Sequence, residues 1–518
     1  MHIVQRPLLI SFFFACAGFT ATASASEQEQ APRLFVTTEK QPPPSEPGPW
    51  LQSWHITIDQ QAIQQPAETI TLNVPGQREI VVRQMYWSPK AGYLSQLVGD
   101  GPEVIWLPDP SAKPDDFAWE WYGRSEGHTV SIVFNYGVIA ARIWTPEHKY
   151  ALQPRPGDVT ELAEVNPDWW QMHPDREEQH PGQAATDTPL HGTPDGLTPS
   201  GPPTWDLGCT APLPTTASTI DVLVMYTTDV LGQYGSHAGV ETEAIRAIKD
   251  ANDSLRNSGI WSVRFFLRGV EQVPPPADPF FNYGLVNIEQ AMFHLAGVQG
   301  TTTNYPGWIY NGNPAVSSRR NALQADVVAL ARIDISGDDT CGVAFVQRLY
   351  DLIGGRIEPG PEFERKSYLV FDPRCGVDRL NLAHELGHLL GMEHDPRNAG
   401  MPGTAFTSCP WSYGHRNSSS NPNAAFRTVM SYADMGSGSG PICTGKHACP
   451  LIDAYSNPAY AWNGAIVPNP TPGALPIGVA TGGSAGPAAR ANDTLARLAP
   501  IVAAFRTRPD LIFANGFQ

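Results

Sequence analysis

One stretch of this sequence decides the fold: His384-Glu-Leu-Gly-His-Leu-Leu-Gly-Met-Glu-His394, followed directly by Asp395. On an α-helix, residues four apart lie on the same face one turn apart, so His384 and His388 can bind one ion. Glu385 is next to the first ligand and can reach a water at the metal without displacing it. The stretch therefore predicts a metal-binding helix with a general base beside the ion.

The end of this helix supplies a third ligand. Gly391 has no Cβ and tolerates a positive φ, so it is suited to end the helix and let the chain turn back. His394 can then reach the same ion from a loop. Three neutral imidazoles leave the fourth position open for water, which is typical of catalytic zinc. We predict one catalytic Zn²⁺ bound by His384, His388 and His394. An amphipathic core helix explains the leucines of this stretch but not three histidines in register.

The pattern His-Glu-x-x-His-x-x-Gly-x-x-His resembles the metzincin metalloendopeptidases, and Asp395 after the third histidine resembles their reprolysin (adamalysin) branch. Arg427-Thr-Val-Met-Ser-Tyr432 resembles the Met-turn, with its methionine 36 residues after His394. Cys341-Gly-Val-Ala-Phe-Val346 is similar to the family's edge strand, which pairs with an extended substrate. The segments 455–458 and 491–494 resemble C-terminal segments of bacterial reprolysin-like proteases.

This resemblance covers residues 219–507 and implies a fold and a reaction. The fold is an α/β (α+β) catalytic domain with a twisted mixed sheet and an active-site helix. The reaction is peptide-bond hydrolysis by a metal-activated water with Glu385 as general base. Met430 would form the floor of the site, and Asp395 would hold the loop after the helix rather than bind zinc.

Tyr432 departs from the reprolysin branch, because eukaryotic reprolysins typically lack a tyrosine two residues after the Met-turn methionine. Astacins and serralysins have one, which acts as a switchable zinc ligand and transition-state hydrogen-bond donor. The resemblance leaves two roles open for Tyr432, this one and plain packing.

Length and composition limit the function further. A chain of 518 residues exceeds the usual single core, so two folded units and linkers are expected. A formal charge of −17 argues against binding nucleic acid. The expected partners are protein or peptide substrates, while calcium binding and oligomeric state are left open.

The N-terminus resembles a secretory signal peptide over residues 1–25, with Arg6, a short apolar run and small residues before the cleavage site. No later run reaches about 18 apolar residues, so stable membrane insertion is not expected. We predict a secreted or extracellular protein. A periplasmic location, or a lipid anchor on Cys16, is the alternative.

Composition divides the rest of the chain. Residues 26–49 are polar and Pro-rich and read as a disordered lead-in. Residues 50–166 carry short strand-like runs and few helical patterns, which predicts a small, mostly β domain similar to a propeptide. Residues 167–218 are a Pro-rich linker. The irregular spacing of its three histidines favours a solvated segment over a metal-binding tract. Residues 219–507 form the protease domain, and residues 508–518 a tail of unexplained role.

Within the protease domain, apolar patterns predict alternating strands and helices. Strands are expected at 219–226, 261–270, 325–333 and 367–371. A helix is expected at 241–257, because its apolar residues recur at helical spacing along one face. This alternation predicts a mixed α/β unit.

Six cysteines remain after the signal peptide, an even number that favours disulfides in an exported chain. Cys443 with Cys449 is a plausible local loop, and Cys341 with Cys375 a plausible tie between strands. Cys209 has two possible roles: its thiolate can occupy the open zinc position as a propeptide switch, or it can form a disulfide, with Cys409 as candidate. The flanking residues favour the disulfide.

Two other functions stay possible from sequence alone. One is a binding protein that keeps the metal site without hydrolysing peptides, which the intact Glu385 argues against. The other is a zinc hydrolase for non-peptide substrates.

Overall fold

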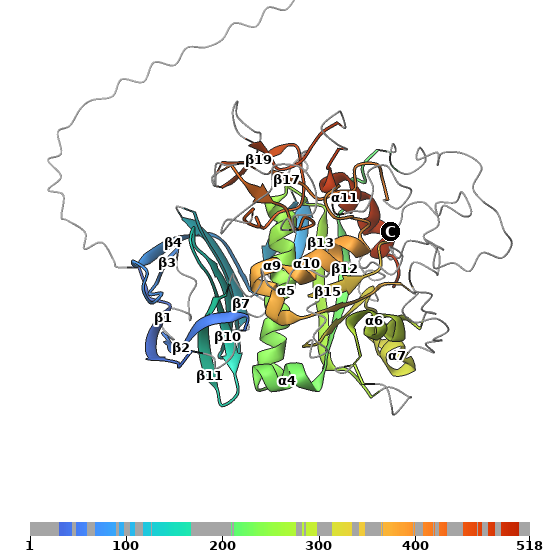
Figure 1. Cartoon of the computed structure of the whole chain (residues 1–518). Helices are drawn as coiled ribbons and strands as arrows, with labels where there is room; N and C mark the ends of the chain where they lie inside the picture. The colour runs from blue at the N-terminus through green and yellow to red at the C-terminus, as the bar shows by residue number, and fades with distance from the viewer. Residues whose placement is uncertain are drawn as a thin grey trace, which may run out of the picture.

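The computed structural model describes residues 31–166, 209 and 212–506 apart from gaps within these ranges (Figure 1). Gaps of six or more residues are 60–67, 98–103, 109–117, 276–281, 298–312, 334–340, 348–363, 399–407, 433–448, 469–474 and 482–487. The predicted signal peptide, most of the Pro-rich linker, its three histidines and the C-terminal tail lie outside the described residues.

The N-terminal part is a nine-stranded antiparallel sheet, in the order β1-β2-β11-β10-β9-β8-β7-β4-β3. Its strands are β1 (Phe35–Lys40), β2 (Trp50–Ile58), β3 (Thr69–Leu72), β4 (Ile80–Pro89), β7 (Ala118–Ser125), β8 (His128–Asn135), β9 (Val138–Trp144), β10 (Lys149–Arg155) and β11 (Val159–Val165). A separate hairpin pairs β5 (Tyr93–Leu97) with β6 (Val104–Pro108). The β-rich character expected for residues 50–166 is confirmed.

The expected disordered lead-in is wrong for part of its length. Residues 35–40 form β1, which pairs antiparallel with β2 at the edge of the sheet. Leu34 and Phe35 are buried in the core of this sheet. The run Phe-Val-Thr-Thr has the β-branched and aromatic residues that strands favour, and of these Phe35 alone is buried.

The C-terminal part contains a mixed five-stranded sheet in the order β13-β12-β14-β16-β15. Its strands are β12 (Ser218–Tyr226), β13 (Val263–Gln272), β14 (Val327–Ala331), β15 (Gly342–Ala344) and β16 (Tyr368–Phe371). Strands β13, β12, β14 and β16 pair in parallel, and β15 runs antiparallel to β16 at the end of the sheet. The predicted mixed sheet and its edge strand are therefore confirmed.

Helices connect and cover these strands. They are α4 (Thr228–Tyr234), α5 (His237–Asn257), α6 (Ile288–Ala296), α7 (Pro314–Ala322), α9 (Gly376–Arg379), α10 (Asn381–Leu389) and α11 (Ala491–Val502), with a 3₁₀ turn η1 (Pro373–Cys375). The helix predicted from residue 241 begins one turn earlier, because the Ser236 side chain caps it by accepting a hydrogen bond from the Gly239 amide. Short strands form two further small sheets: β17 (Arg416–Asn417) with β18 (Phe426–Arg427), and β19 (Tyr460–Trp462) between β20 (Ile466–Pro468) and β21 (Leu475–Pro476).

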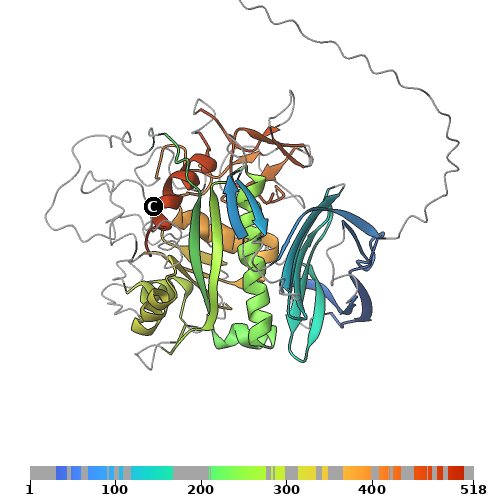
Figure 2. The same ribbon diagram turned by 180° about the vertical axis from the view of Figure 1, so that it is seen from behind.

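The two parts lie side by side, with the long helix α5 between the N-terminal sheet and the five-stranded sheet (Figures 1 and 2). Each sheet has its own apolar cluster. The Trp144 side chain, at the end of β9, belongs to the cluster of the C-terminal part. Within the described part of the chain, no helix is both long and apolar enough to cross a membrane.

Candidate active site

Helix α10 carries two of the predicted metal ligands, His384 and His388, and its first residue is held by side-chain hydrogen bonds. The Asn381 side-chain amide donates hydrogen bonds to the carbonyls of Cys341 (3.0 Å) and Asp372 (2.5 Å). These carbonyls flank β15 and β16, so the start of the helix is tied to the edge of the sheet. Leu380 precedes it with φ +56°, a left-handed conformation that is uncommon for a residue with a Cβ.

The helix ends as the glycine predicts. Gly391 has φ +81°, and the Met392 amide donates to the Gly387 carbonyl at 2.9 Å, which closes the last turn. A Cβ on Gly391 would lie 2.2 Å from Ser408 Oγ. Both the backbone conformation and the close packing therefore require glycine here, and the turn brings His394 back over the helix.

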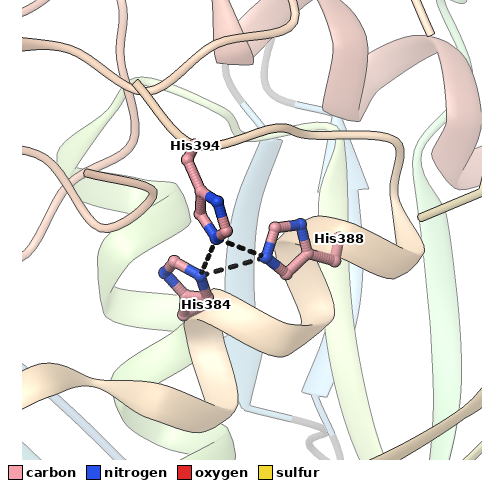
Figure 3. Close-up of side chains that lie close together, drawn as sticks. All are labelled: His384, His388 and His394. Atoms are coloured by element: carbon pink, nitrogen blue, oxygen red, sulfur yellow. Dashed lines mark hydrogen bonds between the residues drawn. The ribbon is translucent and has the colours of Figure 1, made fainter. Parts of the chain in front are cut away.

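The three predicted ligands converge on one point (Figure 3). Nε2 of His388 lies 3.0 Å from Nε2 of His384 and 3.1 Å from Nε2 of His394, and the remaining pair is 3.2 Å apart. Tetrahedral zinc with Zn–N bonds of 2.0–2.1 Å would separate its nitrogens by about 3.3 Å. The spacing fits a single tetrahedral ion.

Hydrogen bonds on the far side of the rings fix which nitrogen faces that point. His384 Nδ1 donates to the Val429 carbonyl at 2.8 Å, and His388 Nδ1 donates to the Met392 carbonyl at 2.7 Å. A carbonyl only accepts, so both Nδ1 atoms carry the proton and both Nε2 atoms present lone pairs. Lone pairs this close repel one another unless a cation lies between them. The donor set therefore fits zinc bound by neutral imidazoles, with carbonyls orienting the rings.

Glu385 lies beside the triad and is 1% exposed. Its Oε2 is buried and has no hydrogen-bond partner among the described residues. Burial raises the pKa of this carboxyl well above its usual value. On the other side it faces β15, where a Cβ at Gly342 would come within 2.4 Å of Oε1. The edge strand thus leaves room for the carboxylate only because residue 342 is glycine.

Tyr432 lies at the same point as the histidines. Its hydroxyl is in close hydrogen-bond contact with Nε2 of His394. Asp395 holds the tyrosine backbone, since its Oδ2 accepts from the Tyr432 amide at 3.3 Å, and Oδ1 lies 3.4 Å from Arg416 Nε. The structure therefore places the Tyr432 hydroxyl at the histidine cluster, and Asp395 holds the loop after the helix as expected.

Met430 lies under the helix, fully buried. A Cβ on Gly387 would lie 2.4 Å from Met430 Sδ, so the helix can rest on the sulfur only at a glycine. Tyr455 supports the same turn of the helix through a 2.6 Å hydrogen bond from its hydroxyl to the Ala383 carbonyl. The predicted segments 455–458 and 491–494 meet, as the Ala491 amide donates to Ser456 Oγ at 3.0 Å.

The cysteines settle one alternative. Cys209 is bonded to Cys409, so its sulfur is not a free thiolate in this structure, and the propeptide-switch interpretation is corrected in favour of the disulfide. Cys341 is bonded to Cys375, as predicted. Cys449 is also disulfide-bonded, and its predicted partner Cys443 lies outside the described residues.

Sequence reasoning missed three supporting residues. Asn381, Gly342 and Tyr455 act on the site through backbone carbonyls or by leaving space, and none belongs to the histidine pattern. Gly342 lies inside the edge-strand motif and Tyr455 begins the segment 455–458, so the sequence signalled these two positions although it did not indicate their contacts.

Comparison with known proteins agrees with this geometry. Residues 216–440 match the family Reprolysin_5, described as metallo-peptidase family M12. The chain is 25% identical over 252 residues to a peptidyl-Asp metalloendopeptidase of Stenotrophomonas maltophilia (strain K279a), covering 48% of this chain and 47% of that protein. The chain thus spans about half the length of this relative.

Two solved structures align with lower similarity. One is the structure of a chaperone–substrate complex, with 16% identity, a TM-score of 0.34, and coverage of 56% of this chain and 36% of the other. The second is metalloproteinase-II from Bacteroides fragilis, with 13% identity, a TM-score of 0.31, and coverage of 66% and 85%. Neither score is high enough to establish a shared overall fold. The family match and the histidine site coincide in sequence: residues 216–440, which match the reprolysin-like metallopeptidases of family M12, contain all three converging histidines.

Proposed function

We propose that this chain is a secreted zinc-dependent endopeptidase made as a proenzyme. The observation that carries the proposal is the convergence of three Nε2 atoms at 3.0–3.2 Å, two of them with their Nδ1 protons held by carbonyls. Zinc bound there would act as a Lewis acid toward a water and a substrate carbonyl.

The surrounding residues suit the proton transfers of peptide hydrolysis. Glu385 is close enough to the triad to take a proton from the attacking water and return it to the leaving amine. After accepting the proton, Glu385 would hold it until the leaving amine takes it. The Tyr432 hydroxyl, in contact with His394 Nε2, would donate a hydrogen bond to the oxygen that gains charge.

Strand β15 supplies a way to hold a peptide. It is the end strand of the five-stranded sheet and lies next to Glu385 through Gly342. An extended peptide can add to such an edge by main-chain hydrogen bonds, with its carbonyl carried to the catalytic carboxylate. This placement supports a peptide substrate over a small ester.

Buried cations near Tyr432 support a preference for aspartate, the residue in the relative's name. Arg379 and Arg427 are each 7% exposed, and Arg427 Nη1 donates to the Ser431 carbonyl at 2.8 Å. Burial, then the nearby Arg427, lowers the pKa of Arg379 to about 9. The positive charge of the two guanidinium groups would attract an acidic substrate side chain. Peptides that differ only by Asp or Asn beside the cleaved bond should differ at least tenfold in kcat/KM, and equal values would remove this preference.

Secretion and a proenzyme form rest on separate observations. The chain begins with a signal-like segment, and two described disulfides suit an oxidising compartment. The Pro-rich stretch between the N-terminal sheet and the protease domain is a suitable site for processing. N-terminal sequencing of the protein recovered from culture medium tests both points.

The activity is tested with purified protein and casein, with and without a chelator. Glu385→Gln should keep stoichiometric zinc, because Glu385 is not one of the three predicted zinc ligands. Its activity should nevertheless fall by about 10³-fold, because the general base is lost. Glu147→Gln is a matched control, since that side chain is 81% exposed on the N-terminal sheet. If metal analysis found no transition metal in the folded protein, the proposal of a zinc-dependent enzyme would be rejected.

The same preparation separates the alternatives. A zinc-loaded protein that leaves casein and peptides intact would be a binding protein. One that cleaves nitrophenyl esters but no peptide would be a non-peptide hydrolase.

A further inference from the structure

Helix α5 is buried on both faces. Five of its charged residues are each at most 5% exposed: Glu243, Arg246, Lys249, Asp250 and Asp253. Lys249 and Asp250 contact the N-terminal sheet, which lies alongside the helix (Figure 2). Ser131 Oγ of β8 donates to Asp250 Oδ1 at 2.8 Å, and Lys249 Nζ donates to Ser131 Oγ at 3.0 Å.

The contact extends along most of the helix. Asn135 Nδ2 of β8 lies 3.3 Å from Thr242 Oγ1 near its start, and Asn257 Nδ2 donates to the Tyr122 hydroxyl at 3.3 Å at its end. At 1.5 Å per residue these points are about 22 Å apart. An apolar cluster adds to this polar contact, because Ala151 and Val165 of the sheet pack with the Cys341–Cys375 disulfide. The two parts therefore share a broad interface rather than a single bond.

Asp453 is the centre of this interface. Its carboxylate accepts hydrogen bonds from the Tyr122 hydroxyl (3.1 Å), Arg124 Nη2 (3.1 Å) and Arg142 Nη2 (3.3 Å). All three donors belong to the N-terminal sheet. Arg142 has no exposed surface and also bridges to Asp250 Oδ1 at 3.2 Å.

The segment around Asp453 supports the metal site. The Ile452 amide donates to the Arg427 carbonyl at 2.9 Å, and the Val429 amide donates to the Ala454 carbonyl at 2.9 Å. The Val429 carbonyl is the group that accepts from His384 Nδ1. Asp453 is thus connected to a metal ligand through one short run of backbone.

A second contact reaches the start of the metal-binding helix. Trp144 Nε1 donates to the Val377 carbonyl at 2.8 Å, and Lys149 Nζ donates to Asp378 Oδ1 at 2.5 Å. Both acceptors are in α9, which directly precedes α10. The N-terminal sheet therefore contacts both segments that orient His384.

We propose that the N-terminal sheet, residues 34–165, stays bound after the chain is cut in the linker, and that Asp453 is the residue through which this docking positions His384. This docking rests on the proposed proenzyme, because a cut in the linker would break the chain without releasing the N-terminal sheet. The docking itself requires no peptidase activity, so the docking and the peptidase function can each fail alone.

Retention is tested on the full-length chain carrying Glu385→Gln, which prevents self-processing. A recognition site for a specific protease is inserted between residues 170 and 200, and the cut protein is passed through a sizing column at micromolar and lower concentration. We expect the two fragments to co-elute at the size of the uncut chain. Separate elution at micromolar concentration would overturn the proposal.

The role of Asp453 is tested by Asp453→Asn, which keeps the shape but removes the charge, with Asp158→Asn in an exposed turn as matched control. After the cut, the Asp453 variant should dissociate at least tenfold more readily than the control. Lys149→Gln, at the edge of the interface, gives a milder second variant if Asp453→Asn does not fold.

A metal readout separates positioning from simple attachment. Cobalt(II) replaces zinc, and its visible absorption and affinity are measured by titration on cut and uncut protein. We expect cut wild-type protein to match uncut protein, and cut Asp453→Asn to bind cobalt about ten times more weakly with an altered spectrum. Unchanged affinity and spectrum in a dissociated variant would overturn the positioning role. A retained complex that binds metal but cleaves no peptide would leave this inference standing and reject the proposed function.

Discussion

Replacement of Gly342 by alanine tests how closely the edge strand and the Glu385 carboxylate depend on each other. The new Cβ would lie 2.4 Å from Glu385 Oε1 and 2.8 Å from its Cδ, whereas ordinary contact begins at 3.4 Å. The carboxylate must therefore move by about 1 Å, and a displacement of that size in a reacting group costs on the order of 100-fold in rate. The displaced atoms are the end of a flexible side chain, so the free energy of unfolding should fall by only about 1 kcal/mol.

The assay measures kcat and KM on a fluorogenic peptide, bound zinc, and urea unfolding. We expect kcat/KM to fall about 100-fold with zinc content unchanged. Gly232→Ala is the matched control: a Cβ there meets nothing within 4 Å, and the helical position should gain roughly 0.5–1 kcal/mol with full activity. Wild-type kcat in zinc-loaded Gly342→Ala would refute the reasoning, because Glu385 would then tolerate a shift of this size. If Gly342→Ala lost its zinc, the substitution would have disturbed the histidine ligands rather than Glu385.

Other predictions follow from the same contacts. Gly391→Ala should lower the free energy of unfolding by about 2–4 kcal/mol in urea titration, because φ is +81° and the Cβ would overlap Ser408 Oγ. Tyr455→Phe removes the hydrogen bond to the Ala383 carbonyl and should cost about 1–3 kcal/mol by the same measurement. Burial lowers the pKa of His415 from 6.5 to about 4, so the stability due to its neutral ring is complete above pH 6.5 and is lost as the pH falls toward 4. His415→Asn should therefore reduce the loss of stability between these pH values by about 3 kcal/mol, and parallel curves would contradict it. Removal of metal by a chelator should lower the melting temperature by the equivalent of about 2.7 kcal/mol if zinc was present at 100 times its Kd.

The metal site could be predicted because its information is local. Helical spacing places His384 above His388, and one glycine at the right position implies the turn that returns His394. These relations extend over a few residues and depend only on backbone geometry, so no knowledge of the remaining fold was needed.

The supporting contacts could not be predicted, because they join residues that are far apart in sequence. Arg142 and Asp453 are separated by 311 positions, and only the finished topology brings them together. Strand β1 was missed for a related reason: its burial depends on pairing with β2, and the polar, Pro-rich residues around it dominate the local composition. The Cys209–Cys409 pair was one of several arithmetic possibilities until the fold placed both cysteines together.

That pair has a practical consequence for any maturation of this chain. Cys209 follows the Pro-rich stretch and is joined to Cys409 across 200 positions. A cleavage before Cys209 leaves no covalent link between the two products, whereas a cleavage after it leaves them joined by sulfur. Electrophoresis with and without a thiol would distinguish the two, since only the second would change from one band to two on reduction.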